Sequence, residues 1–90
     1  MDIAKSCIVR ATAGRDKGKL FVVLEVKDGY VLLVNGKGRR LENPKRKKLR
    51  HVQFCSQNLT RVGEKVLRGD KLTNAELRRT LSELERNDTE

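Results

Sequence analysis

This chain has few aromatic residues and few residues of the kinds that catalyse reactions. It contains no tryptophan, one tyrosine and two phenylalanines, and each of the three falls within an apolar run typical of a strand. Proteins that bind single-stranded nucleic acids stack bases on exposed aromatic side chains, so the sequence argues against that mode of binding. The single histidine, His51, has no serine or cysteine at a spacing that predicts a catalytic pair. We therefore expect that the protein is not an enzyme.

The sequence also has few cysteines and no long apolar run. Cys7 and Cys55 are far apart and have no companions at the spacing of a zinc site, so we expect neither a metal nor another cofactor. No apolar run approaches the roughly 20 residues that cross a bilayer, and the chain opens without a signal-peptide pattern. These absences predict a cytoplasmic protein with no membrane partner, in which Cys7 is a small core residue.

Positive charge is in excess, and the excess is confined to one part of the chain. The 90 residues include 21 Lys and Arg against 12 Asp and Glu, which gives a net charge of +9. Residues 1–50 hold 14 of the cations and 5 of the acids, a balance of +9, whereas residues 51–90 hold 7 of each. An evenly solvated surface would not divide in this way, so the asymmetry indicates a face that binds a polyanion.

Apolar runs in the first part predict a small antiparallel sheet. Strands are expected over residues 6–12, 20–27, 30–34 and 48–54. Asp28 and Gly29, between the second and third strands, are typical of a two-residue type I′ hairpin turn. The second and third strands are nearly continuous apolar runs, which suits a sheet covered on parts of both faces. The sequence therefore predicts a mainly β fold, a small closed or half-closed antiparallel barrel over residues 1–55.

Residues 73–86 show the pattern of a helix. Thr73 and Glu76 match a capping box, in which the hydroxyl of one and the carboxylate of the other satisfy free N–H groups. Three leucines follow at helical spacing and form a narrow apolar stripe: Leu77, Leu81 and Leu84. The stripe is expected to pack on the barrel or, alternatively, to dock a protein partner. Residues 56–72 form a connecting segment, which the pattern leaves open as a short helical turn or an irregular packed segment.

Two basic elements carry the candidate binding residues. The first is the turn between the first two strands, where Gly14 and Gly18 permit positive φ and the close approach of a partner. Its cations are Arg15, Lys17 and Lys19. The second element is a basic loop, whose candidate contacts are Arg39, Arg40, Lys45, Arg46, Lys47, Lys48, Arg50 and His51. Together they predict a bipartite grip on phosphates, in which counterion release gives a salt-sensitive affinity.

Residues 8–23 resemble a KOW motif, the strand-loop-strand element of ribosomal proteins and transcription elongation factors. The chain most resembles the fourteen-e family of archaeal and eukaryotic large-subunit ribosomal proteins. In that family a glycine-basic turn precedes two apolar strands, a basic run and a basic-His-aliphatic strand. Residues 5–54 carry the resemblance, with Arg50 and His51 at the basic-His pair. It implies an SH3-like barrel (a KOW domain) with a C-terminal α-helix, whose loop contacts ribosomal RNA.

After residue 54 the chain departs from that family, because its tail is short and lacks the basic extension of many ribosomal proteins. A small bacterial-type relative that binds RNA or ribosomes is equally compatible with the pattern. The sequence thus predicts a ribosome- or rRNA-associated protein of translation, ribosome assembly or surveillance, which reads the shape and backbone of structured RNA. The alternative is a KOW-type adaptor of the transcription or translation machinery that binds a ribosomal or other protein through the C-terminal helix.

Overall fold

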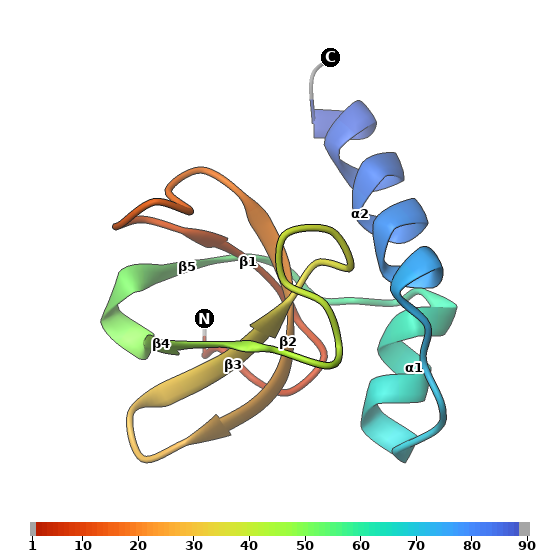
Figure 1. Cartoon of the computed structure of the whole chain (residues 1–90), viewed down its shortest axis with the longest axis horizontal. Coiled ribbons are helices and arrows are strands. Elements are labelled where there is room, and N and C mark those ends of the chain that lie inside the picture. The colour runs from red at the N-terminus through yellow and green to blue at the C-terminus, as the bar shows by residue number, and fades with distance from the viewer. Residues whose placement is uncertain (1, 89–90) are drawn as a thin grey trace.

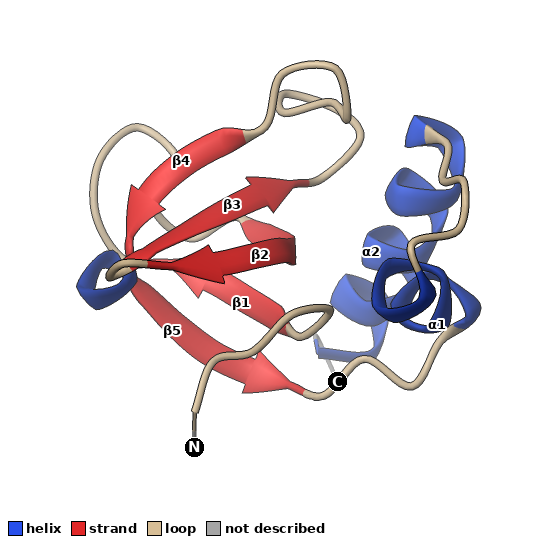
Figure 2. Ribbon diagram, turned by 90° about the horizontal axis from the view of Figure 1, so that it is seen from below, coloured by secondary structure: helices blue, strands red, loops and turns tan. Residues whose placement is uncertain are grey.

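Five antiparallel strands form one curved sheet, and two helices lie together against one side of it (Figure 1). The computed structural model describes residues 2–88. Its elements are β1 (Ile8–Ala11), β2 (Leu20–Lys27), β3 (Tyr30–Val34), β4 (Lys45–Lys48), the single 3-10 turn η1 (Leu49–His51), β5 (Val52–Ser56), α1 (Arg61–Arg68) and α2 (Asn74–Asp88). The view in Figure 2 shows the helices beyond one end of the strands and η1 at the other.

The strands are ordered β4-β3-β2-β1-β5, and each neighbouring pair is antiparallel. The register between β2 and β3 shifts between Val23 and Glu25, which marks a bulge that bends the long strand β2. The mainly β, antiparallel fold predicted from the sequence is confirmed. Within residues 2–88, however, β4 and β5 at the two edges are not hydrogen-bonded to each other, so the sheet does not close into a barrel.

Both faces of the sheet are covered, as the continuous apolar strands predicted. On the inner face, alternate residues of β1, β2 and β3 form one core, which includes Val9, Phe21 and Leu33. On the outer face, Val22 packs with residues of both helices, among them Leu77. Because a strand points its side chains to opposite sides in turn, β2 contributes to both cores and has no polar face over Leu20–Val23.

The second and third strands have the predicted bounds, and their turn has the predicted geometry. Asp28 and Gly29 have φ of 52° and 80°, the two positive values that a type I′ hairpin requires. The first strand is shorter than expected, because Ser6 takes a φ of 82° and interrupts the extended backbone. Cys7 is buried in the inner core, as predicted, and its thiol is free.

The predicted strand over residues 48–54 is wrong. The chain forms β4 over Lys45–Lys48, turns through η1 and begins β5 at Val52. The N–H of Leu49 donates to the carbonyl of Gly29 at 2.9 Å, which fixes the turn against the β2–β3 hairpin. The predicted basic loop is therefore also corrected, since part of it is the edge strand β4. Charged residues suit such a strand because they oppose pairing with another chain.

The C-terminal helix forms as predicted, but only one of the two predicted capping hydrogen bonds is present. The N–H of Glu76 donates to the Thr73 hydroxyl at 3.2 Å, as expected of a capping box. The Glu76 carboxylate instead accepts two hydrogen bonds from Lys65 Nζ, at 3.0 and 2.9 Å. Leu77 and Leu81 are buried against the sheet, so this part of the leucine stripe packs on the β structure. The stripe is therefore not an open docking surface.

The segment that the sequence left open contains α1. Thr60 caps this helix, because its hydroxyl accepts a hydrogen bond from the N–H of Gly63 at 3.3 Å. Val62 and Val66 face the outer core, and Gly69 ends the helix with a φ of 73°. Gly63 sits inside the helix because a Cβ there would lie 2.2 Å from the carbonyl oxygen of Asn58.

Candidate nucleic-acid interface

The β1–β2 loop, residues 12–19, is held by its own backbone. The N–H of Lys17 donates to the carbonyl of Gly14 at 3.2 Å, and the N–H of Gly18 donates to that of Ala11 at 2.8 Å. Gly14 and Gly18 have φ of 81° and 90°, which an L-residue adopts only with strain. Arg10 on β1 also donates to the carbonyl of Gly18. The two glycines thus form the tight loop that the sequence predicted.

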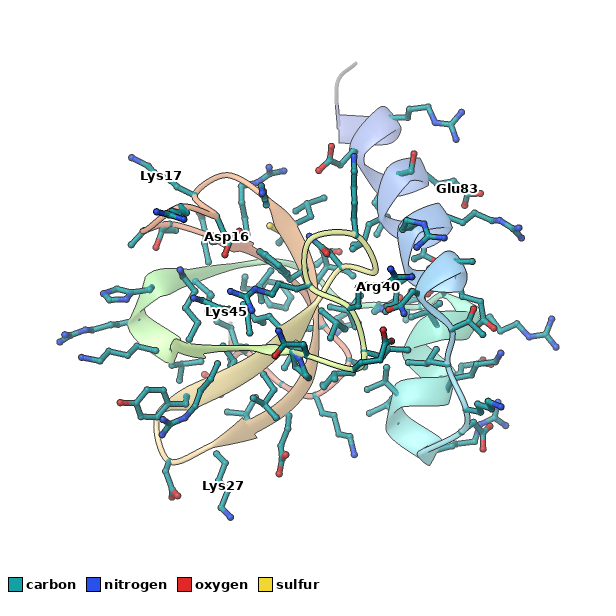
Figure 3. All side chains as sticks on the ribbon, in the orientation of Figure 1. Asp16, Lys17, Lys27, Arg40, Lys45 and Glu83 are labelled. Atoms are coloured by element: carbon teal, nitrogen blue, oxygen red, sulfur yellow. The ribbon has the colours of Figure 1, made fainter. Side chains whose placement is uncertain are left out.

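The cations of this loop differ in their exposure to solvent and in whether an acid lies beside them. Arg15 and Lys17 are exposed and form no hydrogen bond or ion pair through their side chains within the described residues. Lys19 instead lies 3.5 Å from a carboxylate oxygen of Asp16, a partly buried acid of the same loop. Lys17 points away from the body of the molecule (Figure 3). Arg15 and Lys17 are consequently the loop cations most accessible to a phosphate.

Strand β4 splits its four cations between the two faces of the sheet. Lys45 and Lys47 pair with Leu33 and Val31, whose side chains belong to the inner core, so they share the inner face. Lys47 is buried, with an exposed fraction of 9%, whereas Lys48 on the other face is exposed. Among these, Lys45, Lys47 and Lys48 have no hydrogen-bonding or ion-pair partner for their side chains in the described part of the chain.

The β1–β2 loop and the β4–η1 segment meet. The N–H of Thr12 donates to the carbonyl of His51 at 2.8 Å. A Cβ built on Gly14 would lie 3.3 Å from Lys47 Nζ, so the lysine reaches the loop from β4. Arg50 is exposed on η1, and the side chain of His51 is partly buried beside it. We call this assembly of the β1–β2 loop, β4 and η1 the loop end of the molecule.

Two predicted contacts lie elsewhere. Arg39 and Arg40 belong to the β3–β4 loop, residues 35–44, which is attached to α2 rather than to the loop end. The N–H of Leu41 donates to Asn74 Oδ1 at 2.8 Å, and Arg40 lies 3.6 Å from the carboxylate of Glu42. Figure 3 places Arg40 next to the helices and Lys17 on the opposite side. We call α1, α2 and this loop the helical end.

At the helical end, hydrogen bonding also lowers the pKa of one carboxyl, that of Glu42. Asn74 Nδ2 donates to Glu42 Oε1 at 2.6 Å, and the positive charge of Arg40 lies close by. The hydrogen bond from Asn74, followed by weaker effects that include Arg40, holds the pKa of the Glu42 carboxyl below its ordinary value. Arg40 is therefore partly neutralised within the molecule.

Three residues beside the predicted cations were not predicted from the sequence: Tyr30, Lys37 and Arg78. The guanidinium of Arg46 lies 3.8 Å from the centre of the Tyr30 ring, a cation–π contact between β4 and β3. Cross-strand pairing of Tyr30 with Lys48 could have suggested it, but only once the β4 register was known. Lys37 and Arg78 line a groove of about 570 Å³ together with Lys19. The Asn35-Gly36 turn was the sequence signal for Lys37, because Asn35 Oδ1 accepts the N–H of Lys37 at 3.0 Å.

Aromatic rings offer little for stacking against bases. Phe21 is fully buried, and Phe54 is partly buried against the inner core. One face of the Tyr30 ring is covered by Arg46. The loop end can therefore supply cations, backbone N–H groups and one arginine–tyrosine pair, a set that suits contacts to phosphates more than contacts to unstacked bases.

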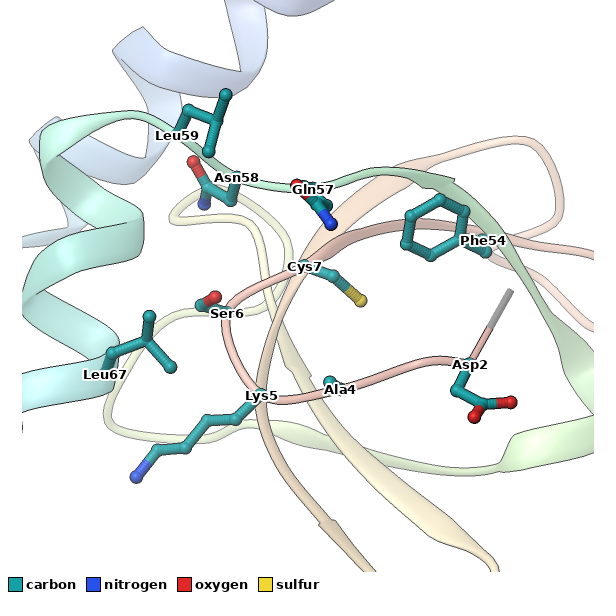
Figure 4. A pocket seen from close by; sticks show the side chains of 10 residues that line it. All are labelled: Asp2, Ala4, Lys5, Ser6, Cys7, Phe54, Gln57, Asn58, Leu59 and Leu67. Carbon is teal, nitrogen blue, oxygen red and sulfur yellow. The ribbon is translucent and has the colours of Figure 1, made fainter.

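A pocket of about 390 Å³ lies away from the loop end, between the N-terminal segment, β5 and α1 (Figure 4). Leu59 and Leu67 line it and expose 87% and 60% of their surface. Its charged lining residues are Asp2 and Lys5. No group of three or more His, Cys, Asp or Glu residues that could hold a metal ion occurs among the residues that the structure describes.

No protein-family model matches this chain, and no curated protein matches its sequence. Over residues 2–88, none of the helices is long and apolar enough to cross a membrane.

Proposed function

We propose that this protein binds structured RNA through the loop end and that its RNA is ribosomal. The observation that carries the proposal is the meeting of two basic elements from distant parts of the sequence, with most of their side chains unpaired inside the molecule. Several such cations on one rigid surface neutralise neighbouring phosphates and release counterions. RNA in A-form presents its backbone and shape more readily than its base edges, and the scarcity of free aromatic rings suits that mode.

The architecture supports the resemblance to KOW domains. The strand order β4-β3-β2-β1-β5, the bulged β2 and the 3-10 turn between β4 and β5 are compatible with an SH3-like barrel that is open between its edge strands. In such a barrel the β1–β2 loop would be the KOW loop. A role in translation, ribosome assembly or surveillance rests on this resemblance, and the proposed activity is binding rather than catalysis.

A charge-reversal experiment tests the proposal. The test variant changes Arg15, Lys17, Lys48 and Arg50 to Glu, four exposed residues of the loop end. The control variant changes four exposed cations on or beside the helical end to Glu, none of which has an ion pair within the described residues: Lys37, Arg61, Lys71 and Arg79. Both variants have the same net charge, so they differ only in where charge is reversed. Circular dichroism checks that each is folded.

Binding is measured by co-sedimentation with ribosomes and by titration of a folded ribosomal RNA fragment at several salt concentrations. We expect the test variant to lose affinity by about 100-fold or more, with a shallower dependence on salt because about four phosphate contacts are lost. The control should lose much less, since screened charges act over only about 8 Å at physiological ionic strength. Equal losses in both variants would contradict the proposal, and a DNA duplex that competes equally would remove its RNA preference.

The alternative function is a protein-interaction adaptor. The exposed leucines Leu59 and Leu67 favour it, because large apolar side chains on a surface often mark contacts with proteins. The same pair of charge variants separates the two functions. An adaptor that uses these leucines would still associate with ribosomes in the test variant and would lose association when Leu59 and Leu67 are changed to Ser.

A further inference from the structure

Lys47 is the one lysine of the described chain that is buried, and no acid neutralises it. Its exposed fraction is 9%, and its side chain has no hydrogen bond or ion pair with any described residue. The stem lies on the inner face of β4, paired with Val31, and the ammonium reaches Gly14. Burial concerns the stem of this side chain, because Nζ is not among the buried polar atoms without a partner and therefore stays accessible to solvent. An anion from outside the chain would supply the missing partner.

The backbone beside this ammonium has free donors. The N–H groups of residues 13–16 donate no hydrogen bond within the described residues, whereas those of Thr12, Lys17, Gly18 and Lys19 all donate. Gly14 has a φ of 81°, and successive N–H groups around such a left-handed residue can form a concave site for an anion. The free donors and the unpartnered ammonium of Lys47 therefore lie at the same glycine.

We propose that Lys47 Nζ and the N–H groups of residues 13–16 form a seat for a single phosphate group. The proposal rests on the function proposed above, in which the loop end binds RNA, and it assigns one backbone phosphate of that RNA to this seat. Free inorganic phosphate has the same tetrahedral oxygens and binds there as well. Gly14 suits this place because its φ of 81° is a conformation that L-residues rarely adopt.

The seat makes stability depend on the ligand. A phosphate that binds Lys47 Nζ and the loop N–H groups binds the folded protein and not the unfolded chain, so it stabilises the folded state. Lys48 is the matched reference, because it belongs to the same strand, carries the same charge and is exposed. Phosphate should therefore stabilise the protein through Lys47 and not through Lys48.

Titration of the wild-type protein with inorganic phosphate, followed by amide NMR, locates the site. The chloride concentration is adjusted to keep the ionic strength constant. We expect the largest saturable shifts at the amides of residues 13–16. Shifts that are absent, or that spread evenly over all basic segments, would overturn the proposal, and this result does not depend on any variant folding.

Thermal unfolding of Lys47→Met and Lys48→Met tests the role of the ammonium. In phosphate-free buffer the Tm of Lys47→Met should be close to that of the wild type. Phosphate at roughly ten times its dissociation constant should raise the Tm of the wild type and of Lys48→Met by about 5–10 °C, and that of Lys47→Met by much less. Equal stabilisation of the two variants by phosphate would refute the seat.

Binding of the folded ribosomal RNA fragment separates this inference from the proposed function. For Lys47→Met we expect about a tenfold loss of affinity and a salt dependence shallower by about one unit. If phosphate binds at residues 13–16 but the wild-type protein does not bind the RNA, the proposed function fails and the seat stands as a site for phosphate alone. If the RNA binds and Lys47→Met behaves as wild type, the seat fails and the proposed function stands.

Discussion

The loop end and the helical end contain similar charged side chains but use them differently. At the helical end, several cations lie beside acids: Lys65 Nζ is 2.9 Å from Glu76, and Arg68 is 3.6 Å from Glu64 and 3.5 Å from Asp70. Lys37, Arg61 and Arg79 at this end have no ion pair within the described residues. At the loop end, Lys19 has an acid beside it, whereas most of the other cations have none among the described residues. The two ends therefore differ in where acids accompany the cations, with ion pairs gathered at the helical end.

The number of cations alone does not identify a binding surface. Arg39 and Arg40 belong to the most basic stretch of the sequence, yet the fold carries them to the helical end, where Arg40 lies beside Glu42. Lys47 comes from the same stretch and reaches the β1–β2 loop without an acid beside it. Whether a charge is free for a ligand depends on the tertiary structure around it.

The largest effect on stability should come from the contact between α2 and the sheet. Leu77 is fully buried in the outer core, so Leu77→Ala should lower the free energy of unfolding by about 2–5 kcal/mol. At temperatures where the variant is folded, its affinity for RNA should equal that of the wild type. Urea denaturation and RNA titration measure the two quantities. A folded variant with weakened RNA binding would show that the helical end takes part in binding.

Much of the sheet follows from local pattern, and the exceptions have physical causes. The apolar runs and the Asp28-Gly29 pair were sufficient to predict β2, β3 and their turn. Strand β4 was missed because four consecutive cations give no hydropathy alternation, although Lys47 faces the inner side and Lys48 does not. Helix α1 was left open because Gly63 reads as a helix breaker, whereas the close approach of Asn58 requires it.

The candidate site was predictable in its parts but not in its assembly. The glycines and cations of the β1–β2 loop could be found from the sequence, since turn chemistry is local. The separation of Arg40 from Lys47 could not, because it depends on a hydrogen bond between Leu41 and Asn74, 33 residues apart. The burial of Lys47 likewise depends on the pairing of β4 with β3.

Two glycines with positive φ, one at each end, differ in the space around them. A Cβ on Gly36 at the helical end would lie 2.3 Å from the carbonyl oxygen of Asn74, whereas one on Gly18 at the loop end would meet nothing within 4 Å. Gly18→Ala should therefore cost only the strain of its φ, about 1–2 kcal/mol. Gly36→Ala should cost about 3 kcal/mol or more, because the β3–β4 loop must also move from α2.

Urea denaturation of both glycine variants gives this difference directly. Gly18→Ala should in addition weaken RNA binding, since it distorts the loop that carries Arg15 and Lys17. Gly36→Ala should leave RNA binding unchanged while the protein is folded. Equal losses of stability would mean that the β3–β4 loop moves away from α2 at little cost in free energy. The attachment of that loop to α2 would then be weaker than the distances suggest.

A smaller effect is expected from the ion pair between the two helices. Lys65 and Glu76 are partly buried, so Glu76→Gln should lower the free energy of unfolding by about 1 kcal/mol or less. Glu64→Gln is the matched control, because its pair with Arg68 is exposed and spans one turn of α1; it should cost about 0.3 kcal/mol. Neither change should affect RNA binding. If Glu76→Gln did so, charges at the two ends would not be independent.

The smallest effect concerns the carboxyl of Glu42 and appears only in acid. Its pKa is lowered in the folded protein, chiefly by the hydrogen bond from Asn74, so folding favours the ionised form. This contribution is present above the ordinary pKa of a glutamate and is lost as the pH falls through the folded value. Urea denaturation in steps from pH 6 to pH 3 should thus show a slightly smaller loss of stability in Glu42→Gln than in the wild type.

Glu25→Gln is the control for this comparison, because Glu25 is exposed on β2 and its side chain has no hydrogen bond or ion pair within the described residues. It should follow the wild-type pH profile. If Glu42→Gln also followed that profile, the Asn74–Glu42 hydrogen bond would not persist in solution. Arg40 would then lack a fixed acid beside it and would resemble the unpaired cations of the loop end.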